Sequence, residues 1–285
     1  MNEFDFYSAP GPMTSLGPHA DGLEGVGTDL KATIDIVQGL LLHLFWAGAY
    51  GVDSTGRDDE VQRRSVVEML DLAKQIDERP LEEPREPDKR VLVNCRHFST
   101  LTAGLLRSAG RPARARCGFA EYFEPGMSVD HWVVEYHDRN TWKLADAQLD
   151  ELQRKAKSID FDPLDVPRDQ FLVAGEAWRR CRDGEDDGDR YGILDMRGLW
   201  FVEGNVPRDL ASLNKMELLP WDAWGVILSG NSEHHRHDDL IDRAARVTVD
   251  ADFDEVRALY DHELLHVPDV ITAMWPEPPR EVRVG

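Results

Sequence analysis

Three side chains that suit covalent catalysis occur between residues 95 and 146. Cys95 stands at the expected start of a helix, His131 opens an expected strand, and Asp146 ends the next strand. At a helix N-terminus the unpaired N–H groups and the dipole favour a thiolate, the nucleophilic form of cysteine. An imidazole that reaches the thiol acts as general base, and a carboxylate behind the ring fixes its tautomer. The alternative for Cys95 is a buried structural cysteine, which is the usual role of an isolated one.

The apolar pattern predicts the elements that position these side chains. CRHFSTLTAGLLRSAG favours a helix that Gly110 closes and Pro112 prevents from continuing. The pattern then predicts three antiparallel strands, at ARARCGF, HWVVEYH and TWKLADA. A turn at 138–140 is expected between the second and third strands. EPGMSVD, before His131, is expected to be flexible. A tight hairpin would stand His131 beside Asp146.

The rest of the chain predicts an α+β plan in a single domain, 1–285. Residues 1–28 are expected to form an N-terminal arm on the surface, and 29–87 a helical part with helices from Asp29 to Leu44 and from about 59 to 76. Residues 88–150 form the predicted catalytic core. Residues 151–285 are expected to be mostly helical, with loops at FDPLDVP, RDGEDDGD and VEGNVPRD. The stretch GNVPRDLASLNKMELLPWDAWG, rich in turn signals, is a candidate lid over the thiol.

Three stretches of the chain follow one family pattern: NCRHFSTLTAGLLRSAGRPARARCGF, DHWVVEY and WKLADAQLD. Together they resemble the transglutaminase-like superfamily, and the chain resembles a bacterial transglutaminase-like domain protein. The resemblance covers roughly residues 88–150. It implies a papain/transglutaminase-like core, with the Cys-bearing helix on a small antiparallel sheet and helical additions at both ends. Cys95 matches the family's nucleophile, His131 its base and Asp146 its orienting acid. The chain departs from the family where Ala147-Gln148 replaces the Pro-Thr that follows the acid in many relatives.

The resemblance implies a cysteine hydrolase or acyltransferase that acts on amide, thioester or ester bonds through a covalent thioester. Water or an amine acceptor would complete the cycle, the substrate being a small-molecule or peptide amide; no cofactor and no metal are implied. The tetrahedral oxyanion needs donors. The Cys95 backbone N–H is one candidate, and Trp46, Asn94 and His97 are candidates for a second.

Two other functions compete with this one. The first is a non-catalytic transglutaminase-like binding module. The second is a zinc hydrolase that uses His262-Glu263-Leu264-Leu265-His266, because H-E-x-x-H on a helix puts both imidazoles on one face. No further His follows His266, however, and Pro268 would end the helix. His234-His235-Arg236-His237 resembles a metal-binding tract or a solvated loop.

Composition excludes several classes of partner. The formal net charge of −21 repels phosphate backbones and anionic lipid, so neither nucleic acid nor a membrane surface is an expected partner. The start lacks the features of a signal peptide, and no apolar stretch is long enough to span a bilayer. Three cysteines without a CxxC pair indicate a reducing compartment, and therefore the cytoplasm.

Overall fold

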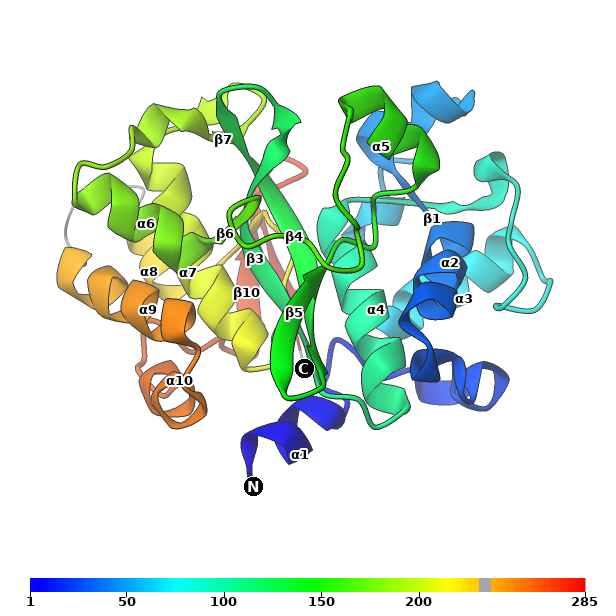
Figure 1. Cartoon of the computed structure of the whole chain (residues 1–285), viewed down its shortest axis with the longest axis horizontal. Coiled ribbons are helices and arrows are strands. Elements are labelled where there is room, and N and C mark those ends of the chain that lie inside the picture. Colours follow the sequence, from blue (N-terminus) through cyan, green and yellow to red (C-terminus); the bar gives the residue numbers. More distant parts are fainter. Residues whose placement is uncertain (231–236, 285) are drawn as a thin grey trace. The chain divides into compact units, whose positions relative to one another are not determined.

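The structure is a computed structural model that describes residues 1–230 and 237–284 (Figure 1). It is a mixed α+β fold with small sheets, as the sequence predicts. The chain divides into two compact units: unit 1 holds Met1–Ala115 and Val133–Val166, and unit 2 holds Arg116–Trp132 and Pro167–Gly285. Two long strands, β3 (Ala113–Glu124) and β4 (Met127–Asp138), contribute residues to both units.

Unit 1 is built from helices and short strands that follow one another closely along the chain. Its helices are α1 (Glu3–Ser8), α2 (Leu30–Leu40), α3 (Val66–Ile76), α4 (Cys95–Ser108) and α5 (Glu151–Lys157). Its complete strands are β1 (Leu41–His43), β2 (Val91–Val93) and β5 (Thr141–Ala145). Short 3₁₀ helices connect them: η1 (Gly17–His19), η2 (Asp21–Leu23), η3 (Val26–Thr28), η4 (Leu44–Tyr50), η5 (Glu60–Gln62) and η6 (Pro87–Lys89).

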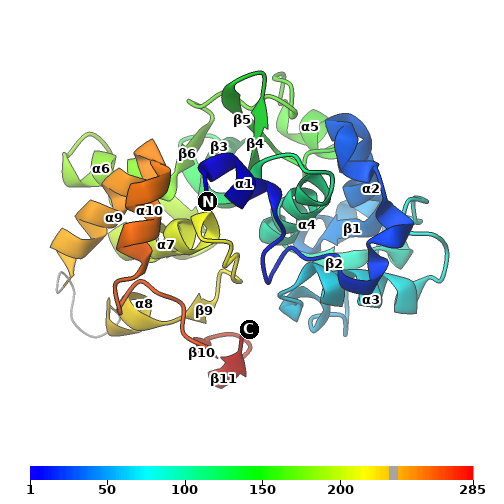
Figure 2. The ribbon, with the colours of Figure 1, turned by 90° about the horizontal axis from the view of Figure 1, so that it is seen from below.

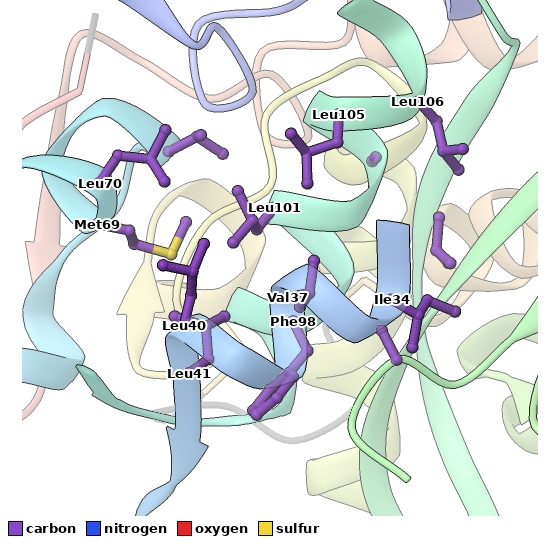
Figure 3. Close-up of a cluster of buried hydrophobic side chains, with 14 of the residues drawn as sticks. Ile34, Val37, Leu40, Leu41, Met69, Leu70, Phe98, Leu101, Leu105 and Leu106 are labelled. Atoms are coloured by element: carbon purple, nitrogen blue, oxygen red, sulfur yellow. The ribbon is translucent and has the colours of Figure 1, made fainter. Parts of the chain in front are cut away.

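The core of unit 1 lies between α2, α3 and α4 (Figure 3). Apolar side chains at helical spacing on α4, such as Phe98, Leu101 and Leu105, meet Val37 of α2 and Met69 of α3. Removing one buried leucine from such a cluster typically costs ~2–5 kcal/mol of folding free energy. This packing fixes the helix that begins at Cys95.

Two expected helix boundaries in unit 1 are wrong. The helix predicted from Asp29 to Leu44 ends at Leu40, and the chain then extends as β1, which pairs in parallel with β2. The helix predicted from about residue 59 begins at Val66, because Ser65 and Glu68 form a capping box there. Apolar periodicity alone did not locate either boundary.

Residues 1–28 are not a surface arm. They form α1 and three 3₁₀ turns, and the side chains of Tyr7, Met13 and Leu16 are buried. Arg107 of α4 donates to the Thr14 hydroxyl at 2.8 Å. A Cβ on Gly104 would lie 2.7 Å from the Thr14 carbonyl oxygen, so the glycine permits this close approach.

The hairpin between β4 and β5 agrees with its prediction. The two strands are antiparallel, with Val134 opposite Ala145 and Asp138 opposite Thr141. Arg139 and Asn140 both have positive φ, 45° and 71°, as a two-residue hairpin loop requires. EPGMSVD is instead a short turn whose second half already belongs to β4, so the flexible segment expected before His131 is absent there.

Unit 2 contains a sheet, a small separate sheet and a group of helices (Figure 2). The strand order of the first is β6 (Phe171–Val173), β3, β4, β7 (Tyr191–Ile193) and β8 (Met196–Arg197), and β5 of unit 1 also belongs to this sheet through its pairing with β4. The second has β9 (Asp222–Ala223), β10 (Val270–Ala273) and β11 (Arg280–Arg283). The helices are α6 (Ala174–Arg182), η7 (Gly188–Arg190), α7 (Leu199–Leu213), α8 (Gly225–Gly230), α9 (Asp238–Asp250) and α10 (Phe253–Tyr260).

The loop predicted at VEGNVPRD is wrong, because these residues lie inside α7 with Pro207 within the helix. Helices α6, α7 and α9 pack against one another, and Val206 and Leu210 of α7 are fully buried. The first half of the stretch proposed as a lid, Gly204–Leu213, is therefore a core helix of unit 2. Burial of α7 overrides the turn signals of its Gly, Asn and Pro residues.

The zinc alternative loses its structural premise. The segment from His262 to His266 follows the end of α10 as a series of turns, and the His262 ring accepts from the Leu264 backbone N–H at 3.2 Å. Within residues 1–230 and 237–284, no group of His, Cys, Asp and Glu has a metal-binding arrangement. His234, His235 and Arg236 lie outside the described residues.

None of the helices in the described part of the chain combines the length and the apolar character needed to cross a membrane.

Candidate active site

Cys95 is the first residue of α4, as predicted. The strand β2 leads into it, and Asn94 between them is the N-cap, whose side chain accepts from the Arg96 N–H at 3.1 Å. Cys95 is 6% exposed, and the helix that it begins is 14 residues long. The thiol is therefore held at the positive end of a long, well-packed helix.

A buried imidazole reinforces this cap. The Nδ1 of His97 accepts from the Asn94 backbone N–H at 3.3 Å, and this nitrogen also lies 2.8 Å from the Asn94 Oδ1, a contact that the same tautomer leaves without a proton. The Nε2 of His97 donates to the Arg63 carbonyl at 2.9 Å. Burial, and secondarily the charge of Arg96, hold the pKa of His97 well below its usual range. Both ring nitrogens of a neutral His97 are engaged, so His97 is a positioning residue and a poor oxyanion donor.

Asn94 keeps one buried polar atom available. Its Nδ2 is inaccessible to solvent and has no hydrogen-bond partner among the described residues. A buried N–H without a partner is costly, about 1–3 kcal/mol, unless a ligand or water engages it. Asn94 therefore stays a candidate for the second oxyanion donor, one residue before the nucleophile.

A parallel strand pair brings a second segment to the same edge as Cys95. His43 at the end of β1 lies opposite Val93 at the end of β2. Parallel strands end at the same edge of their ladder, so η4 after β1 and α4 after β2 start side by side. Trp46 lies in η4 and is partly buried, with Lys157 5.9 Å above its ring. Trp46 thus lies beyond the end of α2, whose last residue is Leu40.

Asp146 follows directly after β5 and is fully buried in unit 1. Its backbone N–H donates to the Pro163 carbonyl at 2.8 Å, and its Oδ1 accepts from the Gln148 N–H at 3.0 Å. The next carbonyl, that of Ala147, accepts from Gln38 of α2 at 3.1 Å. The carboxylate is therefore fixed by a rigid turn anchored to the core that supports α4.

Unit 1 ties this turn to η4. The Tyr50 hydroxyl donates to Asp150, the N-cap of α5. Ala147, after Asp146, and Phe98, one turn into the nucleophile's helix, belong to the same buried cluster. Three segments that are distant in sequence, around residues 46, 95 and 146, thus converge within this unit.

His131 lies in unit 2, on β4, and is 2% exposed. Its ring meets the edges or faces of aromatic rings from β3 and β6: Phe123 at 4.9 Å, Tyr122 at 6.0 Å and Phe171 at 6.5 Å between centroids. An aromatic enclosure fixes the ring and shields it from water. Alternation along β4 puts His131 on the same strand face as Glu135.

No family model matches the chain, and neither a curated protein nor a solved structure matches it. The candidate site therefore stands on the geometry of its own residues.

Several of these contacts were not predicted. The aromatic residues around His131 come from β3 and β6, and no local pattern groups them with the imidazole, because Tyr122 and Phe123 are consecutive and would alternate in direction. The β1–β2 pair and the Gln38 contact join segments about 50 and 109 residues apart, for which the sequence carries no local signal.

Proposed function

We propose that this protein is a cysteine-dependent enzyme that acts on amide, thioester or ester bonds through a covalent thioester on Cys95. The observation that carries the proposal is the position of Cys95 as the first residue of α4, behind a doubly reinforced cap. A cysteine with a purely structural role does not need to be the first residue of a helix. The proposal includes a papain/transglutaminase-like core, which the resemblance of residues 88–150 implies.

In the proposed mechanism His131 removes the proton of the thiol, and the thiolate attacks the substrate carbonyl. Collapse of the tetrahedral intermediate expels the amine or alcohol, which takes a proton from the imidazolium, and leaves the thioester. Water or an amine acceptor then attacks the thioester, with His131 again as base. Asp146 would hold the tautomer of His131. The meeting of His131 with the thiol stays a prediction from the sequence.

Residues of unit 1 supply further support for this chemistry. The Cys95 N–H at the helix start and the Nδ2 of Asn94 are candidate donors to an oxyanion, each worth ~3 kcal/mol of barrier when removed. Arg96 is fully buried in the first turn of α4 and donates to the Arg64 carbonyl at 2.6 Å. A fixed cation close to a reacting centre stabilises negative charge that develops there.

The proposed compartment is the cytoplasm. All three cysteines are free thiols, which agrees with a reducing environment.

Trapping a covalent adduct tests the proposal. The wild-type chain is incubated with a panel of amide, thioester and ester probes, and the modified peptide is identified by mass. We expect one acyl group on Cys95 and none on Cys117, which is fully buried in β3. The matched control is Cys181→Ser, which keeps Cys95 and should acylate like wild type.

Retained turnover in Cys95→Ala would sink the enzymatic proposal. If no probe acylates Cys95 while iodoacetamide labels it rapidly at pH 6, the thiol is activated and the probe class is wrong. If iodoacetamide also fails to label Cys95, the non-catalytic binding module becomes the better interpretation.

A further inference from the structure

An arginine of unit 2 is partly buried and has only long hydrogen bonds to the described residues. Arg208 lies on α7, and among the described residues it forms no ion pair. Its two hydrogen bonds are long, 3.4 Å each, from Nη1 to the Asn205 Oδ1 and from Nη2 to the Asp222 carbonyl. Its Nε is buried and has no partner at all among these residues. Burial lowers the pKa of this guanidinium, yet it stays charged at neutral pH.

An aspartate faces the same helix with half of its carboxylate engaged. Asp130 of β4 is 6% exposed, and its Oδ1 accepts from the Asn205 Nδ2 at 2.7 Å. Its Oδ2 has no hydrogen-bond partner in the described part of the chain. Burial raises the pKa of Asp130, which the hydrogen bond from Asn205 partly offsets. The neighbouring charges that act on this carboxyl are those of Arg208 and His131.

Asn205 joins these two charged groups. Its amide nitrogen binds Asp130 and its amide oxygen binds Arg208, so the acid and the guanidinium converge on one small side chain. They are nevertheless not paired with each other within 4.0 Å. The Asp130–Asn205–Arg208 cluster therefore presents an unengaged acceptor together with several weakly engaged or unengaged donors.

A further donor lies on the same face of β4. Trp132 is two residues after Asp130, so strand alternation directs both side chains to one side of the strand. Trp132 is 1% exposed, and its Nε1–H has no partner among the described residues. Buried tryptophans usually find an acceptor for this group. A ligand carboxylate would supply the acceptor that the Trp132 Nε1–H lacks among the residues that the structure describes.

We propose that Asp130, Asn205 and Arg208 form a binding site for a small ligand with an α-amino carboxylate group. The ligand's carboxylate lies on the Arg208 guanidinium, which matches it as a two-pronged donor, and its amino nitrogen donates to the free oxygen of Asp130. The site is separate from His131, because strand alternation sends Asp130 and His131 to opposite faces of β4. It goes beyond the proposed thiol chemistry and does not depend on it.

The protein's surface charge argues that such a site would be specific. With a net charge of −21 the chain repels carboxylates in general. Binding of an anionic group therefore requires a fixed local cation, and simple electrostatic accumulation cannot produce it.

Isothermal titration of the full chain with glycine, and separately with acetate, tests the proposal. We expect saturable glycine binding that is tighter than acetate binding. Arg208→Met should weaken both ~10- to 100-fold, because charge-assisted hydrogen bonds are lost. The affinity of Arg208→Lys should lie between the affinities of wild type and Arg208→Met, since lysine keeps the charge and loses the two-pronged geometry. Asp130→Asn should weaken glycine and leave acetate nearly unchanged.

Two controls separate binding from folding and from catalysis. Arg246→Met removes an exposed arginine of α9 that pairs with Glu255, and should bind glycine like wild type. Cys95→Ala should also bind normally. Each variant is checked by thermal unfolding, and Arg208→Lys serves if Arg208→Met does not fold.

Three results would overturn the site: no saturable glycine binding by wild type, equal affinity of wild type and a folded Arg208 variant, or a crystal soaked in glycine that holds only an ordered water between Asp130 and Arg208.

Discussion

Cys95 and Cys181 both lie on helices, at opposite ends. Cys95 is the first residue of α4, where the backbone N–H groups point outward, and Arg96 adds a cation in the same turn. Cys181 lies in the last turn of α6, at the negative end of the helix. Burial first, and then the charges of Asp186 and Asp187, raise the pKa of Cys181 to about 11. Burial and two acidic neighbours thus make Cys181 an inert thiol, whereas Cys95 lies where the helix dipole favours a thiolate.

The largest expected effect comes from removing the thiol at the favourable end. Cys95→Ala should lower turnover of any responsive probe by at least ~10⁴-fold, because no other group can form the thioester. The measurement is steady-state turnover together with mass analysis for acyl adducts. Thermal unfolding of the variant should stay close to wild type, since the change removes one small side chain. Substantial turnover by Cys95→Ala would contradict the contrast between Cys95 as nucleophile and Cys181 as inert thiol.

The next largest effect concerns His131 and Asp146, the proposed general base and orienting acid for the Cys95 thiol. Asp146→Asn keeps the shape of the side chain and should lower kcat by ~10³–10⁴-fold, because an amide favours the wrong tautomer of His131. His131→Ala should lose at least as much, and the limb of the pH profile assigned to the base should disappear. The two losses should not add in the double variant, since the residues act as a unit. Additive losses would mean that Asp146 acts only on folding.

The sequence predicted the elements between residues 88 and 150 well, because the signals that define them are local. Gly110 and Pro112 end the helix that starts at Cys95, and the turn at 138–140 fixes the hairpin. Each of these reports backbone geometry within a few residues, and the structure has all of them. The order of helix and strands between residues 88 and 150 follows from such signals.

The sequence failed where tertiary packing decides. Pro207 and the glycine before it read as a loop, yet α7 is buried among α6 and α9, and burial outweighs the local preference. The N-terminal residues read as an arm, yet Tyr7 and Leu16 are buried. His262 and His266 matched a motif whose helix does not form. No local pattern reports the contact of Asn205 with Asp130, which are 75 residues apart.

A smaller effect separates the two roles of Asn94, capping the helix and donating to an oxyanion. Asn94→Ser keeps a good cap and removes the amide donor, so stability should hold while kcat falls ~10²-fold. Asn94→Ala removes both, and should also lose about 1 kcal/mol of unfolding free energy. Denaturant unfolding and turnover are measured on the same preparations. If Asn94→Ser is fully active, the second donor lies elsewhere, with Trp46→Phe as the next variant to measure.

The smallest expected effect concerns Cys181, at the negative end of α6. Because the pKa of Cys181 is raised to about 11, its thiolate fraction at pH 8 is on the order of 10⁻³, against about a quarter for an ordinary thiol. Iodoacetamide labelling of Cys181 should therefore be slow at pH 8 and should rise about tenfold for each pH unit up to the pKa. Peptide mass analysis resolves Cys181 from Cys95 in one sample, and Cys181→Ser should leave turnover unchanged. Labelling of Cys181 as fast as that of Cys95 at pH 8 would show that Cys95 is no more reactive than a buried thiol beside acidic groups, and the assignment of Cys95 as nucleophile would lose its main physical support.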